Sequence, residues 1–222
     1  GASLRVEAEV WERLKSANAA HSMMESAEFF HESDANLVIP KLLQNKTIAI
    51  ARDAAFAFLY PANLACLEDL GAQLRYFSPL RNQAVPDYAD AVFLPGGYPE
   101  LYAKTLQEAH VWQASIRRVH RQGIPIYAEC GGMMSLSEHL LDLDGKQWEM
   151  AGLLPGVIQM QKRLQALGMH SLSLVQGVLR GHTFHFSRFD THLTPATYTK
   201  KQAVPANSEM PLVGEAVYIL NG

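Results

Sequence analysis

From Thr47 onward, short apolar runs alternate with longer segments whose apolar residues recur at helical spacing. Such alternation is typical of a parallel β-sheet covered by helices on both faces. The pattern predicts four strands, at Thr47–Ala51, Gln73–Phe77, Ala91–Leu94 and Ile124–Tyr127. It predicts three helices, at Pro61–Leu70, Ala109–Arg121 and Gly131–Leu141. We therefore expect an α/β fold with an open, mostly parallel sheet.

The pattern differs at both ends of this region. Residues 4–30 favour a helix, and the polar stretch 31–40, which closes on a proline, reads as a linker. After Gly152 apolar and polar residues alternate over shorter segments, which is typical of strands. Three are expected there, at Ser171–Val175, Val178–Leu179 and His182–Ser187. We divide the chain into a tail, residues 1–44, and one domain, residues 45–222.

Composition and charge narrow the range of functions. The 222 residues are 48% hydrophobic and 18% charged, with a formal net charge of −3 and no basic run, so we expect no nucleic-acid partner. No uninterrupted apolar stretch is long enough to span a bilayer, so we expect no membrane association. The two cysteines, Cys66 and Cys130, do not suggest a disulfide framework, which favours the cytoplasm. Cys66 lies in a predicted helix and is expected in the core.

Cys130 stands where an apolar strand runs into a helix that begins near Gly131. A sharp turn of this kind raises the side chain out of the sheet, as in a nucleophile elbow. The positive end of the helix dipole is expected to lower the pKa of the thiol. Gly131 and Gly132 leave space for a ligand. The surroundings favour a nucleophile over a buried structural cysteine.

A Pro-Gly-Gly run follows another predicted strand, Ala91–Leu94. Loops at the carboxyl ends of parallel strands form the ligand crevice of an open sheet, so Gly96 and Gly97 are expected beside Cys130. Glycine N–H groups are suitable donors to an oxyanion, because no side chain blocks the approach. Such a loop is also expected to need a partner domain to hold it. Without Cys130, the run would indicate only a tight turn.

Two histidines, His182 and His185, lie three residues apart on a predicted strand. Side chains alternate between the faces of a strand, so only one of the two can face Cys130. A histidine there could hold the thiolate and protonate a leaving amine. A metal site formed with His192 is the alternative. Because no cysteine or carboxylate lies nearby at a recognisable ligand spacing, we expect no metal.

Together these motifs resemble the class I glutamine amidotransferase domain of cobyrinic and hydrogenobyrinic acid a,c-diamide synthases. The similar segments are, in order, Ala51–Phe56, Pro95–Glu100, Ala128–Gly132 and Gly181–His185, within about residues 45 to 219. The resemblance implies a flavodoxin-like fold in which Cys130 attacks the side-chain amide of glutamine. It implies that His185 increases the nucleophilicity of that cysteine. The oxyanion donors it implies are the N–H groups of Gly97, in the Gly96-Gly97 loop, and of Gly131.

The resemblance also implies a function and its partners. The domain would release ammonia from glutamine for an ATP-dependent amidase that forms the a,c-diamide of a corrinoid in cobalamin biosynthesis. The chain contains no Gly-x-x-x-x-Gly-Lys-Ser/Thr phosphate loop, so no cofactor is expected to bind this domain. ATP and Mg²⁺, together with the corrinoid, are expected in a separate synthetase domain, of which residues 1–44 would be the end and the linker. A homodimer is a possible assembly.

Two features differ from the family pattern. Many class I glutaminases carry a glutamate two residues after the catalytic histidine, where this chain has Ser187, so the group that orients His185 is not identified. The chain ends before a histidine-containing strand expected of the family, so the isolated domain is expected to be truncated and weakly active or inactive. The alternatives are a cobyric acid synthase-like or other tetrapyrrole amidotransferase, a cysteine peptidase or chaperone of similar topology, and a non-catalytic scaffold.

Overall fold

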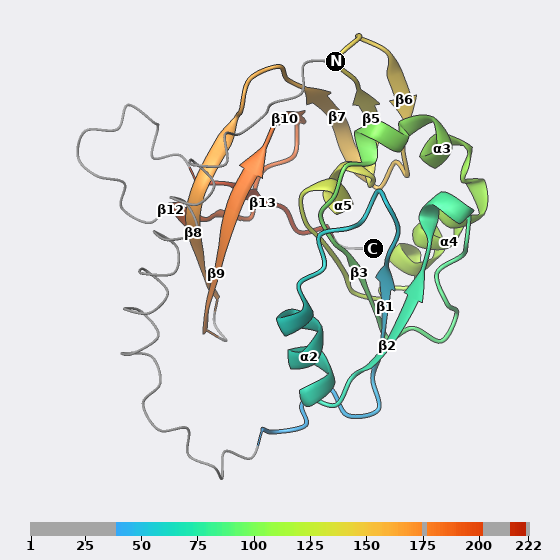
Figure 1. Cartoon of the computed structure of the whole chain (residues 1–222), viewed down its shortest axis with the longest axis vertical. Helices are drawn as coiled ribbons and strands as arrows, with labels where there is room; N and C mark the ends of the chain where they lie inside the picture. The colour runs from blue at the N-terminus through green and yellow to red at the C-terminus, as the bar shows by residue number, and fades with distance from the viewer. Residues whose placement is uncertain (1–38, 175–176, 202–213, 221–222) are drawn as a thin grey trace, which may run out of the picture. The chain divides into compact units, whose positions relative to one another are not determined.

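The computed structural model describes residues 39–174, 177–201 and 214–220. By its internal contacts the chain divides into two units, residues 1–40 and 41–222, and every element described below belongs to the second. The helix expected at 4–30 lies outside the described residues. Figure 1 follows the course of the chain.

A four-stranded parallel sheet of order β2-β1-β3-β4 forms the centre of the second unit. The strands β1 (Thr47–Ala51), β2 (Gln73–Phe77) and β3 (Ala91–Leu94) lie where the sequence predicts them. The last strand, β4 (Ile126–Ala128), begins two residues later than expected. The reason is local: the Ile124 N–H still bonds the carbonyl of Val119, and the residue after it is a proline without an N–H.

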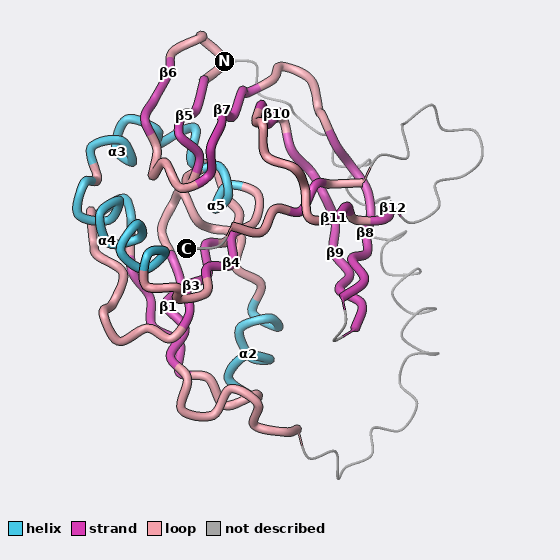
Figure 2. The backbone as a smooth tube through the Cα atoms, turned by 180° about the vertical axis from the view of Figure 1, so that it is seen from behind, coloured by secondary structure: helices cyan, strands magenta, loops and turns pink. Residues whose placement is uncertain are grey.

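Helices cover both faces of this sheet, as predicted. On one face Ala49 and Ala51 of β1 share a core with Trp112 and Ile116 of α4 (His110–Arg121). On the other face Ile48 and Ile50 pack with Leu64 and Leu67 of α2 (Pro61–Asp69). Figure 2 shows the strands between these two helices. The expectation for Cys66 is wrong: it is exposed, because α2 packs through its leucines and buries no residue fully.

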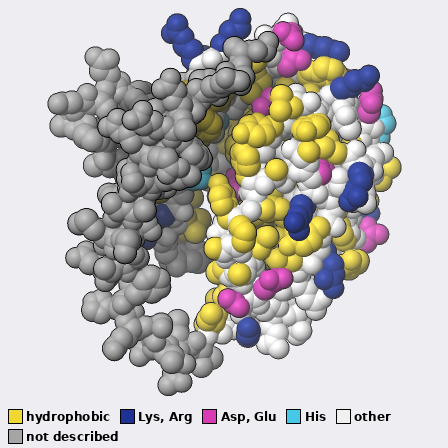
Figure 3. Space-filling model, in the orientation of Figure 1, with side chains coloured by type: hydrophobic (Ala, Val, Ile, Leu, Met, Phe, Trp, Pro, Cys, Tyr) yellow, Lys and Arg dark blue, Asp and Glu magenta, His cyan; other side chains and the backbone are white. Residues whose placement is uncertain are grey.

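Short helical segments follow the strand ends. They are the 3₁₀ turns Pro79–Arg81 and Pro99–Tyr102 and the helix α3 (Ala103–Glu108). None of the helices within the described ranges combines the length and the apolar character that crossing a bilayer requires. On the face seen in Figure 3, acidic and basic side chains are scattered among hydrophobic patches.

The long helix predicted at Gly131–Leu141 is wrong. The helix α5 is a single turn, Gly131–Met134, and the following residues form the strand β5 (Ser137–Leu141). The hydroxyls of Ser135 and Ser137 donate to the carbonyls of Gly132 and Met134, at 2.7 and 2.8 Å. Such local hydrogen bonds compete with helix propagation, and β5 gains strand partners instead.

A second sheet, of order β10-β7-β5-β6, contains this strand. Its other members are β6 (Gln147–Glu149), β7 (Leu154–Met160) and β10 (Ser187–Asp190). β5 and β7 are parallel, while β6 and β10 pair antiparallel to their neighbours. The sequence pattern predicted neither β6 nor β7.

The strands β8 (Ala166–Leu174) and β9 (Gly177–His185) form a long antiparallel hairpin, visible in Figure 1. The expected strands at Val178–Leu179 and His182–Ser187 are largely one strand, β9, and Ser187 begins β10 instead. A short strand, β12 (Lys200–Lys201), pairs with β8. Two further strands, β11 (Thr197–Tyr198) and β13 (Ala216–Val217), pair with each other and bring the residues before β13 next to the hairpin.

Candidate active site

Cys130 occupies the sharp turn between β4 and α5. Its backbone has φ 48° and ψ −119°, a positive φ that is uncommon for a residue with a side chain. The turn is fixed on both sides, since the Glu129 N–H donates to the carbonyl of Leu94 at 3.1 Å and the Met134 N–H donates to the Cys130 carbonyl at 3.0 Å. The side chain is exposed. The elbow geometry expected for a nucleophile is therefore present.

Two glycine backbones converge on the Cys130 thiol. The main-chain N–H groups of Gly131 and Gly97 both lie near enough to the sulfur to lower the pKa of the thiol. The two segments are packed closely: a Cβ placed on Gly131 would lie 2.9 Å from the nitrogen of Gly97, and one on Gly96 would lie 3.3 Å from the Cβ of Cys130. The prediction that the Pro-Gly-Gly loop lies beside Cys130 is confirmed.

Contacts within the chain hold the Gly96-Gly97 loop, and the expectation that a partner domain sets its productive conformation stays a prediction. The Phe58 N–H donates to the carbonyl of Gly96 at 3.0 Å, and the carbonyl of Ala55 lies where a Cβ of Gly97 would be. Asp53 in turn fixes the segment after β1 that contains Ala55 and Phe58. Its carboxylate accepts from Ala55 N–H at 2.9 Å, Ser78 Oγ at 2.8 Å and Leu80 N–H at 2.9 Å.

The contacts between the segment after β1 and the glycine loop could not be predicted from the sequence. The motif Ala51–Phe56 was part of the family resemblance, and it signalled that the segment matters. It did not indicate which atoms the segment holds.

Although the residue is exposed to solvent, the atoms packed around the sulfur partly desolvate the thiol and raise the pKa of Cys130. The N–H groups of Gly131 and Gly97 act in the opposite direction, while the carboxylates of Glu129 and Glu100 raise the pKa further. The predicted lowering by a helix dipole is therefore wrong, because α5 is only four residues long and its dipole is small. Since the thiol is largely protonated near neutrality, a nucleophilic Cys130 needs a base.

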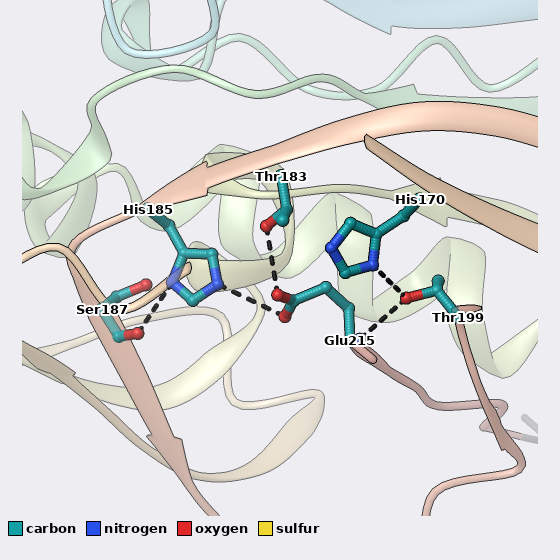
Figure 4. Close-up of polar contacts among 6 residues, drawn as sticks. All are labelled: His170, Thr183, His185, Ser187, Thr199 and Glu215. Atoms are coloured by element: carbon teal, nitrogen blue, oxygen red, sulfur yellow. Dashed lines mark hydrogen bonds and ion pairs between the residues drawn. The ribbon is translucent and has the colours of Figure 1, made fainter. Parts of the chain in front are cut away.

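His185 belongs to a separate hydrogen-bonded group, drawn in Figure 4. Its Nδ1 bonds the main-chain carbonyl of Ser187 at 2.9 Å, and its Nε2 bonds Oε2 of Glu215 at 3.3 Å. The carboxylate of Glu215 raises the pKa of His185, and burial partly offsets this effect. Both ring nitrogens thus have partners other than Cys130. The action of His185 on the thiol remains a prediction.

The expected alternation of the two histidines is confirmed. His185 and Thr183 are partly buried on one face of β9, and His182 is exposed on the other. The ring of His182 lies edge-on to Tyr60, with centroids 6.3 Å apart. Glu215 was not predicted. It lies 30 positions from His185, and no local pattern links the two.

The family of the chain follows from comparison with known proteins. Residues 47–213 match the CobB/CobQ-like glutamine amidotransferase domain. The chain belongs to this family. The cysteine peptidase or chaperone that the sequence left open is therefore not supported, and the α/β fold agrees with this family.

Several similar relatives are a,c-diamide synthases. A cobyrinate a,c-diamide synthase of Herminiimonas arsenicoxydans is 53% identical over 178 residues, or 80% of this chain and 39% of the relative. A hydrogenobyrinate a,c-diamide synthase of Pseudomonas aeruginosa is 46% identical over 81% of this chain and 40% of the relative. This chain thus spans about two fifths of the length of these relatives. The PurLQS structure from Thermotoga maritima aligns with 72% of this chain and 76% of its own, at 13% identity and a TM-score of 0.47, too remote to bear on function.

Proposed function

We propose that this chain is the glutaminase part of an ATP-dependent cobyrinate or hydrogenobyrinate a,c-diamide synthase. The observation that carries the proposal is the sharp turn at Cys130, packed against the main chains of Gly97 and Gly131, whose N–H groups act on the sulfur. An acyl-transfer site needs a nucleophile on a sharp turn and donors that meet the charge that develops beside it. The turn at Cys130 and the N–H groups of Gly97 and Gly131 are our candidates for these two parts, and their proximity supports the proposal.

The geometry suits hydrolysis of the glutamine side-chain amide. The Cys130 sulfur attacks the amide carbon, and the oxygen becomes an oxyanion that accepts from Gly97 and Gly131. One such donor typically contributes about 10²–10³ in kcat. Ammonia then leaves with a proton, which gives a thioester on Cys130. Water attacks the thioester and releases glutamate and the thiol.

Proton transfer in this reaction is assigned to His185. The raised pKa of the Cys130 thiol means that its proton must be removed before attack. A histidine can accept that proton and return it to the departing ammonia, a role that typically contributes about 10²–10⁴ in rate. Of the two histidines on β9, His185 lies on the partly buried face.

In the complete enzyme the ammonia would amidate a corrinoid carboxylate. The relatives are named for cobyrinate and hydrogenobyrinate, which are the substrate candidates. Because a free carboxylate does not react with ammonia, it must first be activated, and ATP with Mg²⁺ would serve this purpose. The chain contains no phosphate loop, so we assign that step to a synthetase part outside it.

The test compares glutamate release and corrinoid amidation by one set of proteins. This chain is assayed alone and with the synthetase part of the Herminiimonas arsenicoxydans relative, ATP, Mg²⁺ and cobyrinic acid. We expect little glutamate release alone and diamide formation only in the mixture. Cys130→Ser should abolish glutamine-dependent amidation, ammonium salts should restore it, and Cys66→Ser should change nothing. Diamide formation by this chain alone, or glutamine-dependent activity in Cys130→Ser, would contradict the proposal.

A further inference from the structure

The carboxylate of Glu215 is held by several parts of the fold. Its Oε1 accepts from the Thr183 hydroxyl at 3.1 Å, and its Oε2 bonds His185 Nε2 at 3.3 Å. The main-chain N–H of Glu215 donates to Thr199 Oγ at 2.8 Å, and that oxygen also bonds the buried His170 at 2.7 Å. Figure 4 shows the carboxylate aimed at the His185 ring. Such tethering fixes the carboxylate before any substrate binds.

The two partners of His185 are both acceptors, which sets the protons that its ring needs in order to bond them both. A main-chain carbonyl only accepts, so the Nδ1 that bonds Ser187 carries a hydrogen. An ionised carboxylate also only accepts, so the Nε2 that bonds Glu215 carries a second hydrogen. With both nitrogens protonated the ring is an imidazolium, and it has no lone pair with which to take a proton from a thiol.

We propose that Glu215 is a positioning residue that holds His185 through Nε2 between turnovers and releases this nitrogen when the histidine acts on Cys130. The inference rests on the proposed function, in which His185 is the base and acid of the reaction. The distances indicate which bond exchanges: Ser187 is 2.9 Å from Nδ1, whereas Glu215 is 3.3 Å from Nε2. Ser187 therefore keeps the tautomer fixed, and the Nε2 lone pair becomes free when His185 loses a proton.

The charges around the pair support this assignment. Glu215 raises the pKa of His185, and His185, with a smaller effect of His170, lowers the pKa of Glu215. From the neighbouring strands, His170 of β8 faces Thr199, and Lys201 of β12 lies against Gly168 of β8. Glu215 is thus the acidic partner among these groups, and it determines the pH at which His185 becomes neutral.

The direct test is the titration of His185 in this chain by NMR. We compare wild type with Glu215→Gln, which keeps the shape but removes the charge, and with Glu215→Asp, which keeps the charge. Glu108→Gln is the control, because it removes one carboxylate from an exposed pair with Lys104 and changes the net charge equally. We expect the His185 midpoint to move to lower pH in Glu215→Gln only, and to stay near wild type in the other two variants.

The second measurement is the pH dependence of kcat/KM for glutamate release, with the synthetase part of the relative added. In Glu215→Gln the acidic limb should move to lower pH, and the plateau should stay within about threefold of wild type, since no transition-state contact is lost. If Glu215→Gln does not fold, Thr183→Val removes one tether of the carboxylate and should move the midpoint in the same direction, by less.

The outcomes separate the two proposals. An unchanged His185 midpoint in Glu215→Gln, or in Thr183→Val where that variant replaces it, overturns the positioning role. A plateau reduced more than about tenfold also overturns it, because Glu215 would then be needed in the transition state. If the midpoint moves but no protein releases glutamate, the pairing stands and the proposed function fails.

Discussion

Replacing Gly131 by alanine should disrupt the oxyanion site without removing any catalytic side chain. A Cβ at this position would lie 2.7 Å from Cδ of Pro99 and 2.9 Å from the nitrogen and the oxygen of Gly97. All three atoms belong to a proline ring or to the main chain, so none can rotate away. The Gly97 segment itself has to move.

The size of this movement sets the expected effect. Non-bonded heavy atoms are most stable at about 3.5–4.0 Å, so Gly97 has to withdraw by about 0.6 Å or more. An oxyanion donor acts at about 2.7–3.1 Å, and a displacement of this size takes its N–H out of range. Loss of one donor costs about 10²–10³ in rate, equivalent to about 2.7–4 kcal/mol. We therefore expect Gly131→Ala to release glutamate about 10²-fold more slowly, or worse.

The assay measures glutamate release with the synthetase part added. It also measures the rate at which a glutamine-analogue electrophile labels Cys130. Gly181→Ala is the matched control, because a Cβ there meets nothing within 4 Å and should leave both rates unchanged. Thermal denaturation shows whether each variant is folded. A folded Gly131→Ala variant with rates within about threefold of wild type would refute the reasoning.

Three further predictions concern the reactive and titratable side chains. A glutamine-analogue electrophile should label Cys130 but not Cys66, although both are exposed and iodoacetamide should modify both; mass spectrometry showing Cys66 as the preferred site would contradict this. Glutamate release should fall about 10²–10⁴-fold in His185→Asn and far less in His182→Asn, and equal losses would refute the assignment to the buried face of β9. The His185–Glu215 pair should stabilise the fold most between the ordinary pKa values of its members, 4.5 and 6.5. Because the pKa of His185 is raised in the folded protein, the stability that His185 contributes is lost as the pH rises from 6.5 through the raised pKa. Because the pKa of Glu215 is lowered in the folded protein, the stability that Glu215 contributes is lost as the pH falls from 4.5 through the lowered pKa. The difference in urea midpoint between wild type and Glu215→Gln should therefore be largest between pH 4.5 and 6.5 and shrink above and below this range. A difference independent of pH would contradict the pairing.

The parallel sheet could be predicted because its strands carry a local signal. In β1 the four residues Ile48–Ala51 are apolar and pack on one face of the sheet or the other, and Pro61 and Gly71 frame α2. These features depend on neighbours a few positions away. The shared edge at the carboxyl ends of the strands then follows from general rules of α/β proteins, whereas the order of the strands was not predicted.

The region after Cys130 could not be predicted in the same way. Gly131–Leu141 has apolar residues at helical spacing, but the hydroxyls of Ser135 and Ser137 end the helix after one turn. β5 is then stabilised by pairing with β7, which lies further along the chain. Pairing with β7 therefore outweighed the helix propensity of this segment, and the local pattern does not reveal that strand.

The same distinction divides the candidate site. The proposed nucleophile and its proposed donors lie at the ends of adjacent strands, and the shared edge of the sheet was enough to predict that they are close. The roles of Asp53 and Glu215 depend on contacts across 25 and 30 positions, and neither contact leaves a trace in the spacing of the residues.

Cys130 and His185 are held by parts of the fold that differ in burial. Cys130, Gly97 and Gly131 are set by a parallel sheet whose neighbouring core residues, including Ala51 and Leu94, are fully buried. His185 is set by a hairpin with an exposed face and by Glu215, whose side chain is more than a third exposed. The proposed oxyanion donors are therefore positioned in advance, whereas the proposed proton acceptor depends on a weaker, solvent-accessible contact with Glu215. If His185 acts on Cys130 as proposed, formation of the neutral His185, rather than assembly of the oxyanion site, is therefore the step at which glutaminase activity would be controlled.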